Sequence, residues 1–216
     1  MHDEPQELYL YGCGGHAKSV IGVLEAQGRY VVAGILDDDP SRRGTQVLGY
    51  DVVGDMTALP ALTDGDVSCA FVTIGDNKAR GEAAARLADA GLTLATIVHP
   101  SSFVMREVAL GIGVFLHAHT AIGAECVIGD HALIGHGVGL GHESVVGRCA
   151  HLAAGVVVGG NAHIGDYSLI GMGAVLMPGV RVGRHVTVAS NSVVSKDLPD
   201  HTVAAGMPAR QVRTTR

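Results

Sequence analysis

The feature that most constrains this chain is an aliphatic residue at every sixth position from Val98 to Val194. A parallel series of small or β-branched residues, from Thr120 to Ser192, stands two positions before the aliphatic ones. If Val, Ile or Leu filled about one position in three, an uninterrupted series of this length would arise with odds on the order of 10⁻⁸. The full aliphatic series is Val98, Val104, Leu110, Leu116, Ile122, Ile128, Ile134, Leu140, Val146, Leu152, Val158, Ile164, Ile170, Leu176, Val182, Val188 and Val194.

A six-residue period excludes a helix, whose apolar spacing is near 3.6, and fits a short strand followed by a tight turn. The glycine that follows many of the aliphatic residues permits such a turn. This period is typical of a parallel β-helix, in which neighbouring coils bury one another's apolar faces. With three hexapeptides per coil, residues 18 apart stack, so that Ile122 lies on Leu140 and Leu140 on Val158. A β-sandwich is disfavoured because its strands alternate at period two with irregular turn spacing.

The N-terminal part of the chain has a different pattern, which predicts a βαβ unit. A strand at Leu8–Tyr11 runs into a glycine-rich turn, and a helix follows that Gly28 ends. Gly12, Gly14 and Ala17 satisfy the G-x-G-x-x-A dinucleotide fingerprint. The next strand, 30–36, ends in three aspartates, where the fingerprint expects an acid that binds ribose. The further elements expected are a strand over 47–53, a short helix over 56–62, a buried strand over 68–74, a helix over 78–90 capped by Asn77 and ended by Gly91, and an extended segment over 92–98.

These patterns predict an α/β domain over residues 1–97, a β-helix over 98–198 and a C-terminal tail over 199–216. The period ends near Leu198, which is too bulky for the small-residue position. The tail is expected to fold back over the last coil, since a solenoid needs a cap at its end.

Composition narrows the function classes. The formal net charge of −6 argues against a general nucleic-acid binder, and the apolar stretches are too short for a membrane span. The first residues lack the basic and apolar regions of a secretory signal, so a cytoplasmic location is expected. The four cysteines lack CxxC metal spacing, and buried free thiols are expected.

Several motifs together resemble one enzyme family over nearly the whole chain. They are YGCGGHAKSV, ILDDD, FVTIGDN, GHES within the repeat, and AGMPA. The chain resembles the sugar O/N-acetyltransferases of the sialic-acid O-acetyltransferase and bacillosamine N-acetyltransferase group. The resemblance implies a Rossmann-like nucleotide-sugar domain followed by a left-handed parallel β-helix that uses acetyl-CoA, assembled as a homotrimer.

The resemblance implies that His142 is the catalytic base and that Glu143 raises its basicity. The residues themselves fit these roles, since acetyl transfer needs a proton taken from an attacking amine or hydroxyl, and imidazole titrates near neutrality. The positions 18 residues away are Ala124 and Gly160, which leave room beside the imidazole for a ligand. The alternative is that His142 is an ordinary turn histidine. Acetyl-CoA contacts implied by the family are His151, Gly160, Met172 and Ser190.

For the nucleotide sugar, the resemblance places Gly14, Gly15 and His16 at the phosphates, Asp37 and Asp38 at the base or ribose, and Gly75 in the same pocket. Glycines allow backbone amides to approach a diphosphate closely. NAD is the competing ligand of the fingerprint, but a domain of under 100 residues holds only about half of a doubly wound dinucleotide fold.

The leading function is therefore N-acetylation of a UDP- or GDP-linked 4-amino-4,6-dideoxy sugar, without a metal. O-acetylation of a sialic-acid-type sugar is the alternative. A γ-type carbonic anhydrase is disfavoured: His131 and His136 have a suggestive spacing, but the position for a third ligand, residue 95, is Ala. A non-enzymatic scaffold is the remaining alternative, because repeats present extended surfaces.

Overall fold

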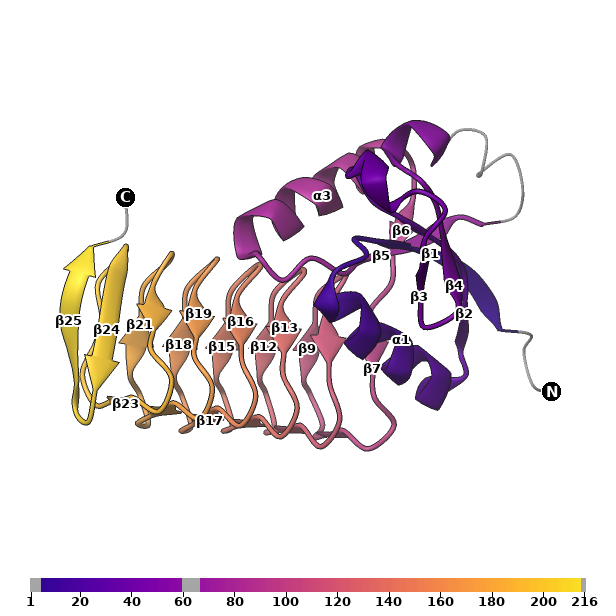
Figure 1. The fold of residues 1–216 in the computed structure, drawn as a ribbon. Helices are drawn as coiled ribbons and strands as arrows, with labels where there is room; N and C mark the ends of the chain where they lie inside the picture. Colours follow the sequence, from indigo (N-terminus) through magenta and orange to yellow (C-terminus); the bar gives the residue numbers. More distant parts are fainter. Residues whose placement is uncertain (1–4, 60–66, 215–216) are drawn as a thin grey trace. The chain divides into compact units, whose positions relative to one another are not determined.

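The computed structural model describes residues 5–59 and 67–214, which divide between Ile97 and Val98 into two compact units (Figure 1). Unit 1 is an α/β domain and unit 2 is a left-handed parallel β-helix. None of the described helices is both long and apolar enough to cross a membrane.

Unit 1 contains a six-stranded sheet in the order β3-β4-β2-β1-β5-β6, with α1 and α3 on opposite faces (Figure 1). Tyr9 and Tyr11 of β1 pack on the side of α3 with Leu87, and the buried residues of α1 cover the other face. The bounds are β1 Gln6–Tyr11, α1 Gly15–Gln27, β2 Tyr30–Leu36, β3 Gln46–Val47, β4 Tyr50–Gly54, β5 Cys69–Val72, α3 Asn77–Asp89 and β6 Thr93–Leu94, with short 3₁₀ helices at Pro40–Arg42 and Met56–Ala58.

Two expectations for unit 1 need correction. The strand expected over 47–53 is a hairpin, because Leu48 and Gly49 both adopt positive φ and form a two-residue turn between β3 and β4. The cap of α3 is Asp76, whose Oδ1 accepts the N–H of Ala79 at 2.8 Å, and Asn77 is the first helical residue. The helix expected over 56–62 is present as far as the structure describes it: Met56–Ala58 form a 3₁₀ helix and Leu59 is helical, while residues 60–62 lie outside the described residues.

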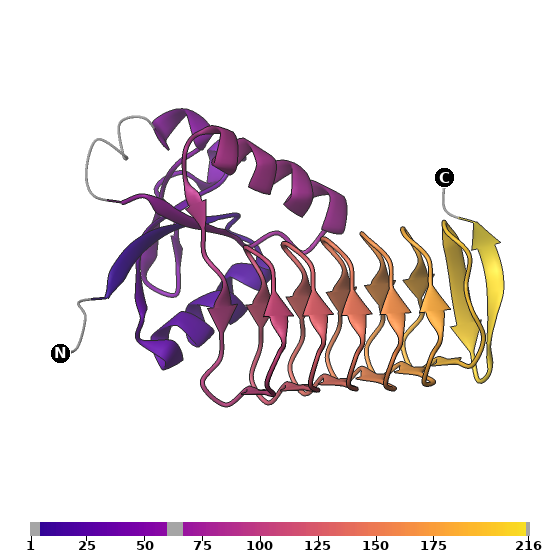
Figure 2. The same ribbon diagram turned by 180° about the vertical axis from the view of Figure 1, so that it is seen from behind.

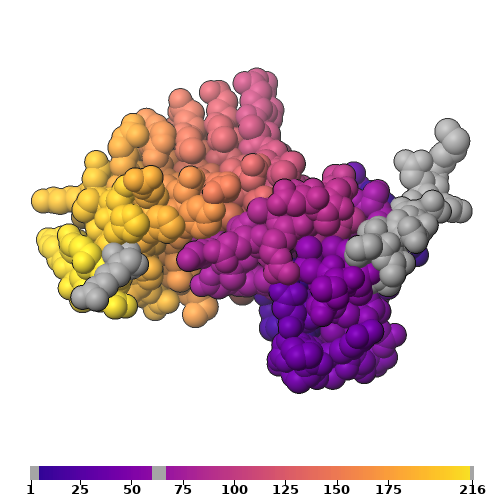
Figure 3. Space-filling model, turned by 90° about the horizontal axis from the view of Figure 1, so that it is seen from above, coloured from indigo at the N-terminus to yellow at the C-terminus, as the bar shows by residue number. Residues whose placement is uncertain are grey.

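Unit 2 is built mainly from two-residue strands in three sheets, one on each side of a prism, and all but the last strand of the chain run parallel. Figure 2 shows its coils from behind, and in the space-filling view they form parallel ridges (Figure 3). Sheet 1 contains β7 Ile97–Val98, β10 Phe115–Leu116, β13 Leu133–Ile134, β16 His151–Leu152, β19 Leu169–Ile170, β22 Thr187–Val188, β24 Thr202–Gly206 and β25 Ala209–Thr214. Sheet 2 contains β8 Phe103–Val104, β11 Ala121–Ile122, β14 Gly139–Leu140, β17 Val157–Val158, β20 Val175–Leu176 and β23 Val193–Val194. Sheet 3 contains β9 Ala109–Leu110, β12 Val127–Ile128, β15 Val145–Val146, β18 His163–Ile164 and β21 Arg181–Val182.

The register confirms the stacking expected from the repeat, since Ile122 pairs with Leu140 and Leu140 with Val158. The aliphatic and the small residues form one continuous interior, in which Leu152 and Ala150 are fully buried. The coils are thereby held in a fixed 18-residue register from β8 to β23.

The last coil departs from this register by two residues. Leu198 bridges to Val182, 16 positions earlier, and packs into the core at the level of an aliphatic residue instead of a small one. The tail then adds β24, which pairs in parallel with β22, and β25, which turns back antiparallel on β24. The bulk of Leu198 therefore shortens the final coil, and the hairpin adds two strands to the end of sheet 1.

Candidate functional site

A cavity of about 450 Å³ in unit 1 brings together all six residues expected to hold the nucleotide sugar. They are Gly14, Gly15, His16, Asp37, Asp38 and Gly75. Four further residues line the cavity: Gly12, the first glycine of the fingerprint, and Tyr11, Thr73 and Ile74, which were not singled out from the sequence. These four stand where β1 and β5 end, so the expected strand ends were the signal that could have found them. The cavity thus lies at the carboxyl ends of neighbouring parallel strands, a common ligand position in such sheets.

The glycine-rich turn is shaped by its approach to the segment after β5. Gly12 has φ +109°, and a Cβ at this position would lie 3.0 Å from Cγ1 of Ile74. The turn is anchored from both sides, because the Gly12 N–H donates to the Leu36 carbonyl at 2.8 Å and the Thr73 N–H to the Tyr11 carbonyl at 2.8 Å. The N-terminus of α1 therefore opens onto the cavity, where a helix favours an anion.

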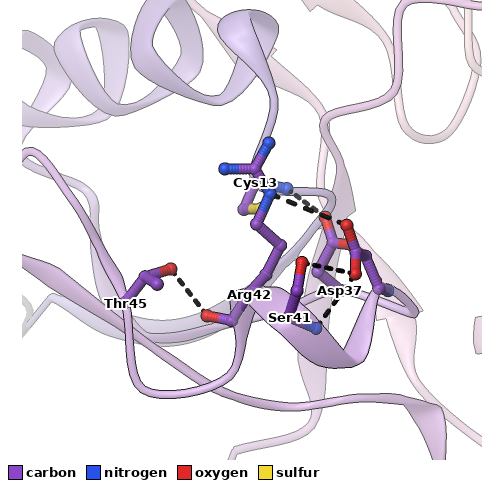
Figure 4. A network of polar contacts seen from close by, with 6 residues as sticks. Cys13, Asp37, Ser41, Arg42 and Thr45 are labelled. Atoms are coloured by element: carbon purple, nitrogen blue, oxygen red, sulfur yellow. Dashed lines mark hydrogen bonds and ion pairs between the residues drawn. The ribbon is translucent and has the colours of Figure 1, made fainter.

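Asp37 ties the glycine-rich turn to the end of β2. Its Oδ2 accepts the N–H of Cys13 at 2.8 Å, and its Oδ1 accepts the N–H of Asp39 at 2.9 Å. Burial raises the pKa of Asp37, but the hydrogen bonds from Cys13 and Asp39 outweigh burial and leave this pKa lowered. Burial next to this carboxylate raises the pKa of the Cys13 thiol to about 11. Figure 4 shows the network, with Arg42 extending toward Cys13.

Asp38, which also lines the cavity, is held by a different partner, Arg86. Its Oδ2 accepts a hydrogen bond from Nη1 of Arg86 at 2.8 Å, and the same Nη1 donates to the Tyr11 hydroxyl at 3.0 Å. The Arg86 hydrogen bond is the main cause that lowers the pKa of Asp38. Both expected ligand-binding acids are thus ionised and already accept hydrogen bonds from the protein, which the sequence did not reveal.

In unit 2, His142 and Glu143 form a pair at the corner between sheets 2 and 3, in the turn from β14 to β15. Nδ1 of His142 lies 2.9 Å from Oε2 of Glu143, and both side chains are largely exposed, at 68% and 57%. Glu143 adopts a left-handed backbone with φ +57°. The Nδ1–Glu143 contact fixes the tautomer in which Nε2 carries the lone pair.

Gly160 belongs to the next coil and stands directly against the His142 ring. A Cβ at Gly160 would lie 2.7 Å from Nε2 of His142, so only glycine leaves the ring in this place. The His142 carbonyl accepts the Asn161 N–H at 2.8 Å. The buried Ser144, a member of the small-residue series, donates from Oγ to the Gly159 carbonyl at 3.1 Å. The turn that carries His142 is therefore fastened to the coil that follows it.

The other expected acetyl-CoA residues lie elsewhere on the prism. His151 is in β16 of sheet 1, while Met172 and Ser190 are at the corner between sheets 1 and 2. Met172 is 59% exposed, and Ser190 is also exposed. Within one chain, the structure brings Gly160 to the His142 pair but places the other three residues on a different side of the β-helix.

The two histidines considered for a metal are separated in the same way. His131 lies at the corner between sheets 3 and 1, whereas His136 lies at the corner between sheets 1 and 2, with its ring 5.5 Å from that of His117. Across residues 5–59 and 67–214, no group of three or more His, Cys, Asp or Glu side chains is arranged to hold a metal ion.

Comparison with known protein families matches both units of the chain. The PglD N-terminal domain model matches residues 7–87, and the bacterial transferase hexapeptide model matches residues 125–160 and 161–196. No curated protein sequence matches the chain.

Among solved structures, the chain is similar to PerB from Caulobacter crescentus in complex with CoA and GDP-perosamine, with 40% identity, a TM-score of 0.91, and coverage of 96% of this chain and 97% of that one. It is also similar to the acetyltransferase domain of PglB from Neisseria gonorrhoeae in complex with acetyl coenzyme A, with 28% identity, a TM-score of 0.89, and coverage of 96% and 100%. The order of the two matched family models and the similarity over almost the full length point to the same family. The chain belongs to the hexapeptide-repeat sugar N-acetyltransferases that carry a PglD-type N-terminal domain.

Proposed function

We propose that the chain transfers an acetyl group from acetyl-CoA to the 4-amino group of a GDP-linked 4-amino-4,6-dideoxy sugar. The observation that carries this proposal is the His142–Glu143 pair, whose Nε2 faces the bare backbone of Gly160. The choice of GDP rests on the 40% identity to PerB, a structure with GDP-perosamine. Such a reaction belongs to the biosynthesis of glycans, and we place it in the cytoplasm, where acetyl-CoA is available.

In this mechanism the sugar amine attacks the thioester carbonyl of acetyl-CoA. His142 accepts the amine proton on Nε2 as the C–N bond forms, and Glu143 stabilises the resulting imidazolium through Nδ1–H. The tetrahedral intermediate then breaks its C–S bond, and the proton on Nε2 passes to the departing thiolate. The products are the acetamido sugar and CoA, and His142 returns to its neutral form.

The cavity in unit 1 would hold the nucleotide. The diphosphate would lie at the N-terminus of α1, near Gly14, Gly15 and His16, because backbone N–H groups and the helix dipole favour an anion there. The cavity is open beside Gly75, where a Cβ would meet nothing within 4 Å. Asp37 and Asp38 would accept hydrogen bonds from the base or ribose with their remaining lone pairs.

In a homotrimer, the expected acetyl-CoA residues that lie far from His142 within one chain would come close to the His142 of a neighbouring copy. His151, Met172 and Ser190 of one copy would meet the His142 corner of a neighbour, so that acetyl-CoA lies between two prisms. The outward row of sheet 2 supports self-association, because it carries no charged side chain: Phe103, Ala121, Gly139, Val157, Val175 and Val193. Light scattering should give three times the chain mass. A monomer with full activity would contradict this assembly.

A thiol-release assay with acetyl-CoA tests the substrate. The panel contains a GDP-linked and a UDP-linked 4-amino-4,6-dideoxy sugar, together with free and CMP-linked sialic acid. We expect turnover with the GDP-linked amine above all. Turnover with a sialic acid and with neither amine would overturn N-acetylation, and a preference for the UDP-linked amine would overturn only the choice of base.

A further inference from the structure

We propose that Arg86, at the end of α3, is a positioning residue of the nucleotide cavity, where it holds the Asp38 carboxylate in place to receive a hydrogen bond from the nucleoside. The inference rests on the proposed function, since it assumes that the cavity takes a nucleotide. Arg86 itself does not line the cavity, whereas Asp38 and Tyr11 do.

The geometry singles out Arg86 because one of its nitrogens serves two cavity residues. Nη1 donates to Oδ2 of Asp38 at 2.8 Å and to the Tyr11 hydroxyl at 3.0 Å. The guanidinium carbon also lies 5.7 Å from the centre of the Tyr11 ring, in cation–π range. Arg86 therefore joins the ends of β1 and β2 from a third element, and neither Asp38 nor Tyr11 can turn without breaking a contact to it.

Asp38 needs such a partner because its surroundings are acidic. Asp37 and Asp39 flank it in the chain, and Asp55 lies close enough to interact with it electrostatically. Without a cation, mutual repulsion would turn the Asp38 side chain outward or favour its protonated form. With Arg86 in place, the pKa of Asp38 lies below its ordinary value, so the carboxylate stays ionised and fixed.

A second arginine of α3 supports the view that this helix shapes the cavity. The buried Arg80 donates from Nη1 to the carbonyl of Gly75 at 3.0 Å and from Nη2 to Oδ1 of Asn77 at 2.8 Å. Gly75 belongs to the cavity wall. Helix α3 thus fixes one wall through Arg80 and the acidic side through Arg86. Arg80 is 1% exposed and its loss would disturb folding, so Arg86, at 49% side-chain exposure, is the residue to test.

The test is calorimetric binding of GDP-mannose and of UDP-N-acetylglucosamine to the full-length protein, for wild type, Arg86→Gln, Arg86→Lys and Tyr11→Phe. Both probes carry a diphosphate esterified at each end, so their own charge stays constant across the pH range used. The matched control is Lys78→Gln, which removes an exposed cation from the same helix, 3.8 Å from Glu82. Circular dichroism and the melting temperature report whether each variant folds.

We expect Arg86→Gln to weaken nucleotide binding about tenfold, the value of one hydrogen bond to a charged group, and Arg86→Lys to restore part of it. KM for the nucleotide sugar should rise in parallel, while KM for acetyl-CoA stays unchanged. Binding is measured at pH 7 and at about pH 5, and any loss at the lower pH should be larger in Arg86→Gln than in wild type, because the pKa of Asp38 rises once its cation is lost. Lys78→Gln should behave as wild type.

Equal binding by folded Arg86→Gln and wild type at both pH values would overturn the role of Arg86 and leave the proposed function intact. If Arg86→Gln fails to fold, Tyr11→Phe carries the test, because it removes one of the two hydrogen bonds that Nη1 of Arg86 donates. Binding by Tyr11→Phe equal to that of wild type at both pH values would then overturn the role of Arg86. If wild type binds neither probe while the His142 corner still transfers acetyl groups, the cavity is not a nucleotide site. That result would overturn both this inference and the proposed nucleotide pocket.

Discussion

Nε2 of His142 lies so close to Gly160 that a Cβ on that glycine would stand 2.7 Å away from it. The two residues are 18 positions apart and belong to consecutive coils. Gly160→Ala should therefore displace an exposed imidazole without disturbing the buried core. We expect turnover to fall between about tenfold and about 100-fold, with little change in melting temperature, because misplacing a catalytic group by about an ångström has such an effect.

The control for this substitution is Gly22→Ala. Gly22 is exposed within α1, and a Cβ there would meet nothing within 4 Å. Turnover should be unchanged and the free energy of unfolding should rise by about 0.5–1 kcal/mol, because alanine favours the helix. Full activity of Gly160→Ala would mean that the position of the His142 ring does not matter for the reaction.

Glu143→Gln keeps the shape of the side chain and removes its charge. The amide oxygen can still accept from Nδ1 of His142, but it stabilises the imidazolium less. We expect kcat to fall about tenfold while both KM values change little, measured by thiol release. A rise in KM without loss of kcat would instead place Glu143 in substrate binding.

Cys13 makes the stability of unit 1 sensitive to alkaline pH. Burial is the main cause that raises the pKa of the Cys13 thiol to about 11 in the folded state. The unfolded chain loses this proton near pH 9, so the folded protein still holds the proton at a pH where the unfolded chain has lost it. The contribution of Cys13 to the free energy of unfolding is fully present below pH 9 and is lost between pH 9 and about 11. The melting temperature should fall over that window, by less in Cys13→Ser, and iodoacetamide should barely modify Cys13 at pH 8.

The interior of the β-helix should respond to truncation as a packed core. Leu152 is fully buried in the aliphatic stack, and Leu152→Ala should lower the free energy of unfolding by about 2–5 kcal/mol in denaturant titrations. Val212, in β25, is 65% exposed, and Val212→Ala should change it by less than about 0.5 kcal/mol. Similar effects for the two variants would contradict the tight interior that positions the His142 turn.

The repeat in the sequence predicted the β-helix and its 18-residue register because each coil repeats one local pattern. It missed the shift at the end, where Leu198 pairs with Val182 at a spacing of 16. That shift is decided by how a bulky side chain fits the core, not by the period. The exchange of Asn77 for Asp76 as the cap of α3 has a similar origin, since both residue types cap helices and only backbone geometry separates them.

For the candidate site, motifs identified the residues of the cavity but not their partners. The sequence predicts that Asp37 and Asp38 bind the ligand, and the structure adds that Cys13 and Arg86 already donate hydrogen bonds to them. Arg86 is 48 residues from Asp38, so no local pattern could connect the two. From the sequence, Gly160 is expected to leave open space beside the His142 ring. The structure shows instead that the ring fills this space, because the stacking of the coils brings His142 and Gly160 into contact.

The most direct test of the account compares wild type and His142→Asn in a single-turnover assay, with acetyl-CoA and a GDP-linked 4-amino-4,6-dideoxy sugar, read by mass spectrometry of the product. Binding of the GDP-sugar is measured in parallel, so that a loss of rate at saturating GDP-sugar is separated from a loss of affinity. We predict an acetamido product with wild type and a loss of rate of at least about 100-fold with His142→Asn. Product formation at the wild-type rate by His142→Asn would show that His142 is not the catalytic base.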